Sequence, residues 1–283
     1  MSSENANEVL AAWETSAQYW SKYQALIETM FAPLSRALIE EAGICTGHTV
    51  LDVGGGSGEP SFTIAATVGE AGSVVYTDPA AGMVKSAQTE AERRLLTNIK
   101  FQQCAAEKLP FADSSFDVVV SRLSAMFFAD ASAAFGQTLR VLKPGGTASF
   151  LVWAEREANP FFNVVTEILD RFVPAELEEE DAPTAFRFAA AEKLAGLLRA
   201  AGASPVSERE FSFVIEAPIT VDQFWHLRTE MSDSFRKKLA RLVPDQVAAI
   251  RYTVQKKVGS YFKSGTMSFP GKVRIVSGKK PDA

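Results

Sequence analysis

Short apolar runs alternate with helix-like periods along most of the chain. Seven runs rich in β-branched and aromatic residues predict strands, over residues 50–53, 73–77, 99–103, 116–121, 147–153, 207–215 and 272–277. Between most of these runs, apolar residues recur every three or four positions, which predicts helices. Strands that alternate with helices in this way are typical of an α/β protein with a mostly parallel sheet.

Helical patterns also stand outside this alternation. Residues 8–31 predict an amphipathic helix that ends before Pro33, and residues 34–42 predict a second helix closed by Gly43. Further helical patterns fill residues 218–262. We therefore expect a helical lid over 1–44, a core over 45–217, a helical insert over 218–264 that caps the substrate site, and a final strand and tail over 265–283.

Composition narrows the classes of function. The chain has 283 residues, 47% of them hydrophobic, and a net charge of -5, so it can bury a large core and has no global attraction for nucleic acid. Two cysteines and two histidines are too few for a disulfide scaffold or a structural metal. The start lacks a signal-peptide pattern, and no apolar run reaches membrane-spanning length. We expect a cytoplasmic monomer or homodimer, without metal, that acts on a small molecule.

A glycine-rich loop follows the first predicted strand. Gly54, Gly56 and Gly58 stand at every second position, and Pro60 then begins an apolar-periodic helix. The dinucleotide fingerprint G-x-G-x-x-G would need a third glycine at position 59, which is Glu59. Asp52, two residues before the first glycine, is an anion that favours a cationic ligand over a pyrophosphate.

This loop resembles the first motif of class I S-adenosylmethionine-dependent methyltransferases, in the form Asp52-x-Gly54-x-Gly56-x-Gly58. Asp78 follows 20 residues beyond Gly58 at the end of the second strand, where an acidic side chain can accept both ribose hydroxyl protons. Residues 104–117 are similar to a further signature of the family, and the likeness over 45–155 is greatest to the UbiE-type enzymes. The resemblance implies a Rossmann-like seven-stranded sheet in the order 3-2-1-4-5-7-6, with strand seven antiparallel, helices on both faces and a helical cap.

The resemblance also assigns residues to the site. Ala105 departs from the family, which usually has Asp there for the adenine amino group, so that contact would come from backbone or Glu107. The expected cofactor contacts are Tyr19, Asp52, Gly54, Gly55, Gly56, Gly58, Asp78, Pro79, Met83, Ala105, Ala106, Glu107, Ser121 and Arg122. The expected substrate contacts are Trp20, Met126, Phe127, Trp153 and Trp225.

The implied activity is methyl transfer from S-adenosyl-L-methionine to a small aromatic or hydrophobic acceptor, at carbon, oxygen, nitrogen or sulfur. His226 is the candidate for a general base, if the acceptor needs one. Arg122 is expected to steer the cofactor carboxylate or an anionic substrate, or to serve in an ion pair. Two alternatives stay open: a non-catalytic module that binds S-adenosylmethionine, and an NAD(P)-dependent oxidoreductase.

Overall fold

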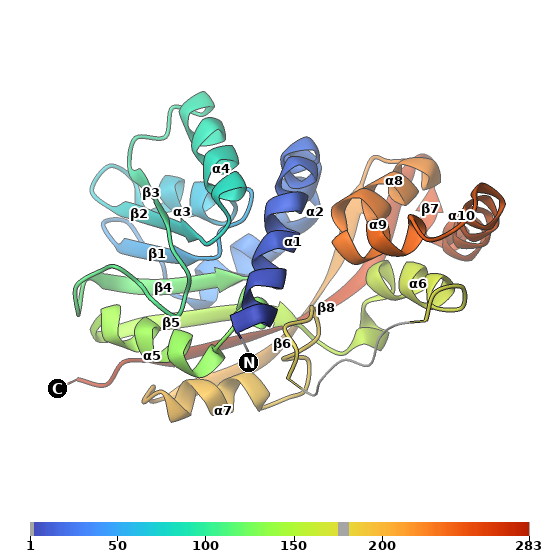
Figure 1. Ribbon diagram of the computed structural model, residues 1–283. Coiled ribbons are helices and arrows are strands. Elements are labelled where there is room, and N and C mark those ends of the chain that lie inside the picture. The colour runs from blue at the N-terminus through green and yellow to red at the C-terminus, as the bar shows by residue number, and fades with distance from the viewer. Residues whose placement is uncertain (1–2, 175–180, 283) are drawn as a thin grey trace.

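One mixed sheet organises the chain in the computed structural model, which describes residues 3–174 and 181–282 (Figure 1). Its strands run in the order β3-β2-β1-β4-β5-β8-β6, with β7 paired to β8, and β8 is antiparallel to both β5 and β6. The predicted order is thus confirmed, with β8 as the predicted seventh strand. The strands are β1 (Thr49–Val53), β2 (Ser73–Asp78), β3 (Ile99–Gln103), β4 (Phe116–Arg122), β5 (Leu142–Trp153), β6 (Val206–Ala217), β7 (Phe262–Lys263) and β8 (Thr266–Lys279).

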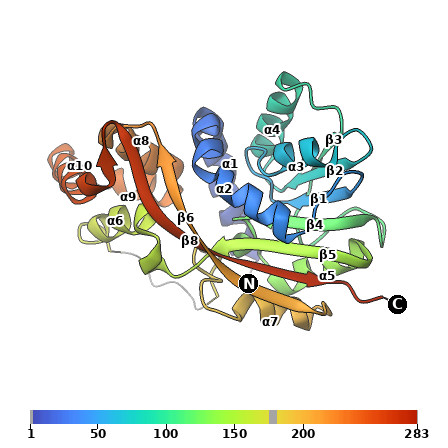
Figure 2. The same ribbon diagram turned by 180° about the vertical axis from the view of Figure 1, so that it is seen from behind.

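Helices cover both faces of this sheet, as two opposite views show (Figures 1 and 2). The central part of the sheet is buried and apolar, because β1 and β4 carry continuous runs such as Val118–Val120 rather than alternating polar positions. The helices that flank it are α2 (Gln24–Glu41), α3 (Ser61–Val68), α4 (Ala81–Arg93), α5 (Ala131–Val141) and α7 (Lys193–Ala200).

The first helical break differs from the prediction. Helix α1 (Ser3–Lys22) ends before Tyr23. Helix α2 continues through Pro33, whereas the predicted second helix starts after this proline. Apolar side chains from Ile27 to Leu38 keep helical spacing on both sides of the proline and are buried against the sheet. Burial of that continuous face outweighs the single backbone hydrogen bond that proline removes.

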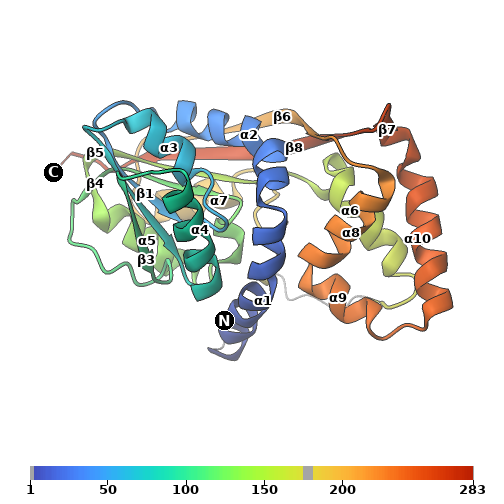
Figure 3. The same ribbon diagram turned by 90° about the horizontal axis from the view of Figure 1, so that it is seen from above.

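A second group of helices, called the cap below, lies beside the sheet (Figure 3). Helices α8 (Val221–Met231), α9 (Asp233–Leu239) and α10 (Pro244–Val258) lie between β6 and β8 in the chain, and α6 (Pro160–Leu169), which follows β5, packs against α10. Strands β6 and β8 pair over twelve consecutive positions and extend past the last β5 partner, so they carry the cap as a two-stranded ribbon.

The acidic run over residues 176–181 is typical of a solvated connection. Apart from Asp181, it lies outside the described residues. No helix in the described part of the chain combines the length and apolar character that crossing a bilayer requires.

Candidate functional site

The glycine loop is held in place by the end of β2. Backbone N–H groups of Gly54 and Gly55 both donate to the carbonyl oxygen of Thr77, each at 2.9 Å. The Tyr76 hydroxyl donates to the carbonyl oxygen of Gly56 at 2.6 Å. The loop therefore bends over the carboxyl end of β2, next to the switch point between β1 and β4 where open α/β sheets bind ligands.

Asp78 organises two backbone segments with one carboxylate. Its Oδ2 accepts from Gly56 N–H at 3.1 Å, and its Oδ1 accepts from Ala80 N–H at 2.9 Å, just before α4. Burial raises the pKa of Asp78 to about 6, and the two backbone hydrogen bonds act in the opposite direction. Each carboxylate oxygen keeps a second lone pair that can accept from a ligand.

A cavity of about 440 Å³ lies above this loop. Its polar side is formed by the loop, the end of β2 and the segment after β3: Gly54, Gly55, Gly56, Ser57, Asp78, Pro79, Cys104, Ala105, Ala106 and Glu107. Met83 and Arg122 also line it. The structure thus brings together most of the predicted cofactor contacts, whose binding stays a prediction.

Aromatic side chains close the other side of the cavity. They come from α1, α2 and the segment after β4: Trp13, Trp20, Phe31, Phe127 and Phe128. The Trp13 ring meets the edge of Phe127 at a centroid distance of 5.0 Å and that of Trp20 at 5.7 Å. Among the described residues the buried Trp20 Nε1–H has no hydrogen-bond partner.

Helix α1 is docked on the polar side as well. Glu14 accepts hydrogen bonds from the N–H groups of Ala81 at 2.5 Å and Gly82 at 3.0 Å, which are the first two residues of α4. Helix α4 has no side-chain cap of its own, and these orphan N–H groups favour an anion. The predicted lid segment therefore rests directly beside Asp78 and Met83.

Arg122 links α2 to the end of the loop. It is half-buried, and it donates to Ser35 Oγ at 2.7 Å and to the carbonyl oxygens of Glu59 at 3.0 Å and Phe31 at 3.3 Å. Burial lowers the pKa of its guanidinium, against the attraction of Glu59 and Asp52. Arg122 thus fixes the cavity wall at the end of β4.

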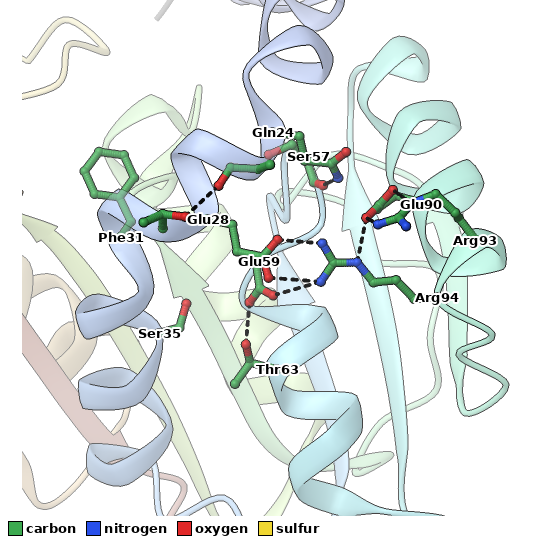
Figure 4. Close-up of polar contacts among 12 residues, drawn as sticks. Gln24, Glu28, Phe31, Ser35, Ser57, Glu59, Thr63, Glu90, Arg93 and Arg94 are labelled. Carbon is green, nitrogen blue, oxygen red and sulfur yellow. Dashed lines mark hydrogen bonds and ion pairs between the residues drawn. The ribbon is translucent and has the colours of Figure 1, made fainter. Parts of the chain in front are cut away.

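A charged cluster supports the same corner from outside (Figure 4). Arg94, which follows α4 directly, donates to both Glu28 oxygens, at 3.1 and 2.5 Å, and to Glu90 at 2.7 Å, while Glu59 Oε1 lies 3.9 Å away. Burial raises the pKa of Glu59, and its Oε2 accepts from Thr63. The cluster ties α2, α4 and the start of α3 together around the loop.

The structure corrects the expected role of Asp52. Its side chain is 0% exposed and does not line the cavity. Ser61 Oγ donates to Oδ2 at 2.7 Å, and Oδ1 has no partner within the described chain. Because burial raises the pKa of Asp52 to about 7, this carboxyl is not the fixed anion that the sequence suggested. It lies beneath the loop, behind Gly55.

Other expected cofactor contacts also lie outside the cavity. Gly58 has a φ of +115°, and its missing Cβ position is filled by the Phe62 ring, so it serves packing below the loop. Ser121 is fully buried within β4. Tyr19 faces the cap, where the Arg236 guanidinium lies 4.7 Å from its ring centroid.

The expected substrate contacts divide in the same way. Trp20 and Phe127 line the cavity, whereas Met126, Trp153 and Trp225 are buried in apolar packing outside it. His226 lies on the outer face of α8 with 53% of its side chain exposed, 4.0 Å from Glu230. It does not line the cavity, so its prediction as a base is corrected. Apolar spacing alone did not separate cavity walls from core.

Several cavity residues that follow β4 directly were not in the list of expected contacts. Leu123, Ser124 and Phe128 line the cavity, and Leu123 adopts a φ of +59°. A positive φ is uncommon for a branched side chain and is often found at functional sites. Their position at the carboxyl end of a central strand is the sequence signal for them.

The arrangement agrees with comparisons to known proteins. A family model described as a methyltransferase domain matches residues 51–150, from within β1 into β5, and so covers the loop, Asp78 and the segment around Ala105. Residues 51–150 are a class I methyltransferase domain. Domains of this class use S-adenosylmethionine, and the match argues against the oxidoreductase alternative.

Relatives of this methyltransferase domain share part of their length with the chain. The uncharacterized protein Rv1405c of Mycobacterium tuberculosis is 36% identical over 147 residues, which are 52% of each protein. The ubiquinone/menaquinone biosynthesis C-methyltransferase UbiE of Cellvibrio japonicus is 36% identical over 131 residues, 44% of this chain and 53% of that one. The chain thus spans about half the length of these relatives.

Similarity to solved structures extends over the whole fold. The crystal structure of the cyclase SpnF matches with a TM-score of 0.58 and 20% identity, over 96% of this chain and 98% of that one. At this identity the likeness shows the fold alone. The fold of this chain thus also occurs in a protein named as a cyclase, so the fold by itself does not define the reaction.

Replacing Gly56 with alanine tests the cavity floor. Gly56 has a φ of +54°, and a Cβ added there would meet no protein atom within 4 Å, so the methyl group would occupy ligand space. We expect Gly56→Ala to weaken S-adenosylhomocysteine binding at least tenfold by calorimetry. Left-handed backbone strain of about 1 to 2 kcal/mol should lower its melting temperature slightly.

Gly43→Ala is the matched control for that strain. Gly43, at the end of α2, has a φ of +63° and equally open surroundings, but it does not line this cavity. It should lose a similar amount of stability and bind S-adenosylhomocysteine normally. Equal affinity of the two variants would contradict the assignment of the cavity floor.

Asp52 should make the stability of the free protein depend on pH. Its pKa is raised from 3.8 to about 7 on folding, so between these values the folded state holds a proton that the unfolded state has released. Stability should therefore decrease as pH rises through this window, by at most about 4 kcal/mol at 1.36 kcal/mol per unit. Asp78, with its pKa raised to about 6, contributes in the same direction.

Asp52→Asn removes this titration and retains an oxygen that can accept from Ser61. Urea denaturation at several pH values between 4 and 8 should show a flatter stability profile for Asp52→Asn than for the unaltered protein. If the stability profiles of Asp52→Asn and the unaltered protein are parallel, Asp52 is ionised in the folded protein across this pH range.

Proposed function

We propose that this protein transfers a methyl group from S-adenosylmethionine to a small, hydrophobic acceptor, most simply an aromatic one. The observation that carries the proposal is a single cavity with two different sides. The loop, Asp78 and the segment Cys104–Glu107 make one side polar, and five aromatic rings make the other side apolar. Its volume is within the range of small-molecule sites.

The polar side fits the cofactor. The open space above Gly56 is room for a ligand next to backbone, and Asp78 can accept from ribose hydroxyl groups through its remaining lone pairs. Glu107 and the backbone of Ala105 and Ala106 are the candidates for adenine, since Ala105 has no polar side chain. S-adenosylmethionine supplies a methyl group on a sulfonium, a good leaving group.

The aromatic side fits the acceptor. Trp13, Trp20 and Phe127 would exclude water and hold a flat apolar molecule by stacking and edge contacts.

The residues of the cavity favour catalysis by alignment of the two reactants over catalysis by proton transfer. Neither of the two histidines lines the cavity, and burial raises the pKa of the cavity thiol, Cys104, to about 11. Holding two reactants in line can lower a barrier by about 7 to 11 kcal/mol. The proposal therefore gives the chain the role of positioning the acceptor and keeping out water, with the acceptor atom left open.

A methyl-transfer screen tests the proposal. We expect a labelled methyl group to pass from S-adenosylmethionine to one or more members of a panel of phenols, quinols, thiols and amines, detected by mass spectrometry. Asp78→Asn is the control. It replaces one carboxylate oxygen, which accepts hydrogen bonds from backbone N–H groups and could accept from ribose hydroxyl groups, with an amide NH₂ that can only donate. It should weaken S-adenosylhomocysteine binding about tenfold or more.

The outcomes separate the alternatives. Binding of S-adenosylhomocysteine without transfer to any acceptor would favour a non-catalytic binding module or a cyclase-like use of the fold. Tighter binding of NADH than of S-adenosylhomocysteine would restore the oxidoreductase alternative.

We also propose that α1 is a lid that must move to admit the cofactor. Glu14 holds α1 to the start of α4, and Trp13 and Trp20 cover the cavity. Glu14→Ala should therefore speed proteolytic cleavage before about residue 30 in the free protein, and S-adenosylhomocysteine should slow it. Tryptophan fluorescence should change in step with this protection.

Glu8→Ala is the control on the same helix, since Glu8 is exposed. It should be cleaved at the rate of the unaltered protein. Equal protection of Glu14→Ala with and without ligand would show that α1 is permanently docked and its aromatic residues are ordinary packing.

A further inference from the structure

Arg228 is a buried cation without a counter-charge among the described residues. It lies on α8 in the cap and is 8% exposed. Over residues 3–174 and 181–282, no carboxylate lies within ion-pairing distance of it and no hydrogen-bond acceptor meets it, and its Nε is buried without a partner. Burial alone lowers the pKa of Arg228 to about 9.

Aromatic rings surround this guanidinium. Its carbon lies 4.7 Å from the ring centroids of Phe161 and Phe162 on α6, and 5.6 Å from that of Phe235 on α9. Ring faces attract a cation, but they accept none of the five N–H bonds that a guanidinium presents. The rings hold the group in a fixed direction and leave its hydrogen-bonding capacity unused.

Arg274 is the other fully buried arginine among the described residues, and it is satisfied. Arg274 on β8 pairs with Glu208 at 3.2 Å and Glu210 at 3.1 Å and donates to the carbonyl oxygen of Ala189. The half-buried Arg187 also has a buried Nε without a partner in the described chain, but it still donates to the carbonyl oxygen of Phe128. An unpaired buried charge destabilises a fold unless a ligand compensates it.

Arg228 does not line the cavity, but packed aromatic rings connect it to the cavity wall. The Phe162 ring lies 4.6 Å from Trp153, and Trp153 lies 5.8 Å from Phe31, whose side chain lines the cavity. Helix α6 follows β5 at the same carboxyl edge of the sheet as the glycine loop. A contiguous row of aromatic rings thus leads from the cavity wall to the guanidinium.

We propose that Arg228 binds an anionic group, a carboxylate or a phosphate, and that this group belongs to the methyl acceptor. The anion site rests on Arg228 and its surroundings alone, whereas its assignment to the acceptor rests on the proposed function. Both oxygen anions can take two parallel N–H bonds from a guanidinium. The acceptor would then be an aromatic or hydrophobic acid.

Thermal unfolding with three related probes tests the anion site. The probes are 1-naphthoate, 1-naphthyl phosphate and the neutral 1-naphthol, at constant ionic strength in chloride and with S-adenosylhomocysteine present. We expect at least one anionic probe to raise the melting temperature of the unaltered protein more than 1-naphthol does. The comparison of carboxylate with phosphate identifies which anion the site prefers.

Variants of Arg228 decide whether this residue is responsible. Arg228→Met should abolish the extra stabilisation by the anionic probe, with at least a tenfold loss of affinity, and keep the response to 1-naphthol. Arg209→Met is the matched control, because Arg209 also lies over a ring, that of Phe211, but is paired with Glu41. It should respond like the unaltered protein.

Several results would overturn the proposal. They are an equal response to charged and neutral probes, an anion response that persists in Arg228→Met, or loss of it in Arg209→Met. If Arg228→Met does not fold, Arg228→Lys, which keeps the charge but loses the planar fork, should bind the anionic probe more weakly than arginine does. Unchanged affinity there would equally count against the site.

The assignment to the acceptor has its own test. Among acceptors found by the methyl-transfer screen, Arg228→Met should lower kcat/KM for an acid and leave that for its neutral ester unchanged. Cofactor binding, measured as S-adenosylhomocysteine affinity, should not change. An anion site without any methyl transfer would refute the proposed function and leave Arg228 as an anion-binding residue.

Discussion

The hydrogen bonds between the glycine loop and the end of β2 are the constraint on which the site depends. Thr77 holds the start of the loop through its carbonyl oxygen, and Asp78 and Tyr76 hold Gly56 on its two polar sides. A loop fixed in this way exposes backbone to the cavity without a side chain at Gly56, so ligand space exists before any ligand binds. Because Asp78 also caps the turn into α4 through Ala80, the place where α1 docks is set by the same carboxylate.

Much of this constraint could be predicted from local sequence. A short apolar run before glycines, and Asp78 at the end of the next run, are signals that lie within a few residues of the structure they encode. Sheet order followed from the family resemblance and is confirmed by the pairing of β8 between β5 and β6. The chemical state of Asp52 could not be predicted in this way, because its raised pKa depends on burial beneath a loop and beside α3.

Residues in the helices were harder to place, for a physical reason. Helical spacing shows that Trp20 and Trp225 are each buried on one side, and the apolar run that ends at Trp153 indicates a buried strand. Neither pattern shows what these rings are buried against. In the structure Trp20 lines the cavity, Trp153 packs between Phe31 and Phe162, and Trp225 belongs to the cap. Likewise, Arg228 stands on a helix whose pattern gave no sign that its guanidinium is enclosed by rings of α6 and α9. Such positions depend on contacts between segments far apart in the chain.

Helix α1 connects the two parts of the molecule that would have to cooperate. On the cofactor side, Glu14 joins it to α4. On the cap side, Glu230 of α8 accepts from Lys22 at 2.6 Å and Tyr23 at 2.9 Å, and Arg236 of α9 donates to Ser16 at 2.9 Å.

Since Glu230 is two residues beyond Arg228 on the same helix, a shift of α1 would change contacts at both the polar side of the cavity and the helix that carries the Arg228 cation. The exposed ion pair of Lys22 with Glu230 contributes little energy by itself. Helix α1 therefore connects the two parts through its position between them and not through the strength of this pair. A methyltransferase domain that is shared with relatives over only half their length can in this way acquire its own acceptor preference, through a cap and a helix outside the matched residues 51–150.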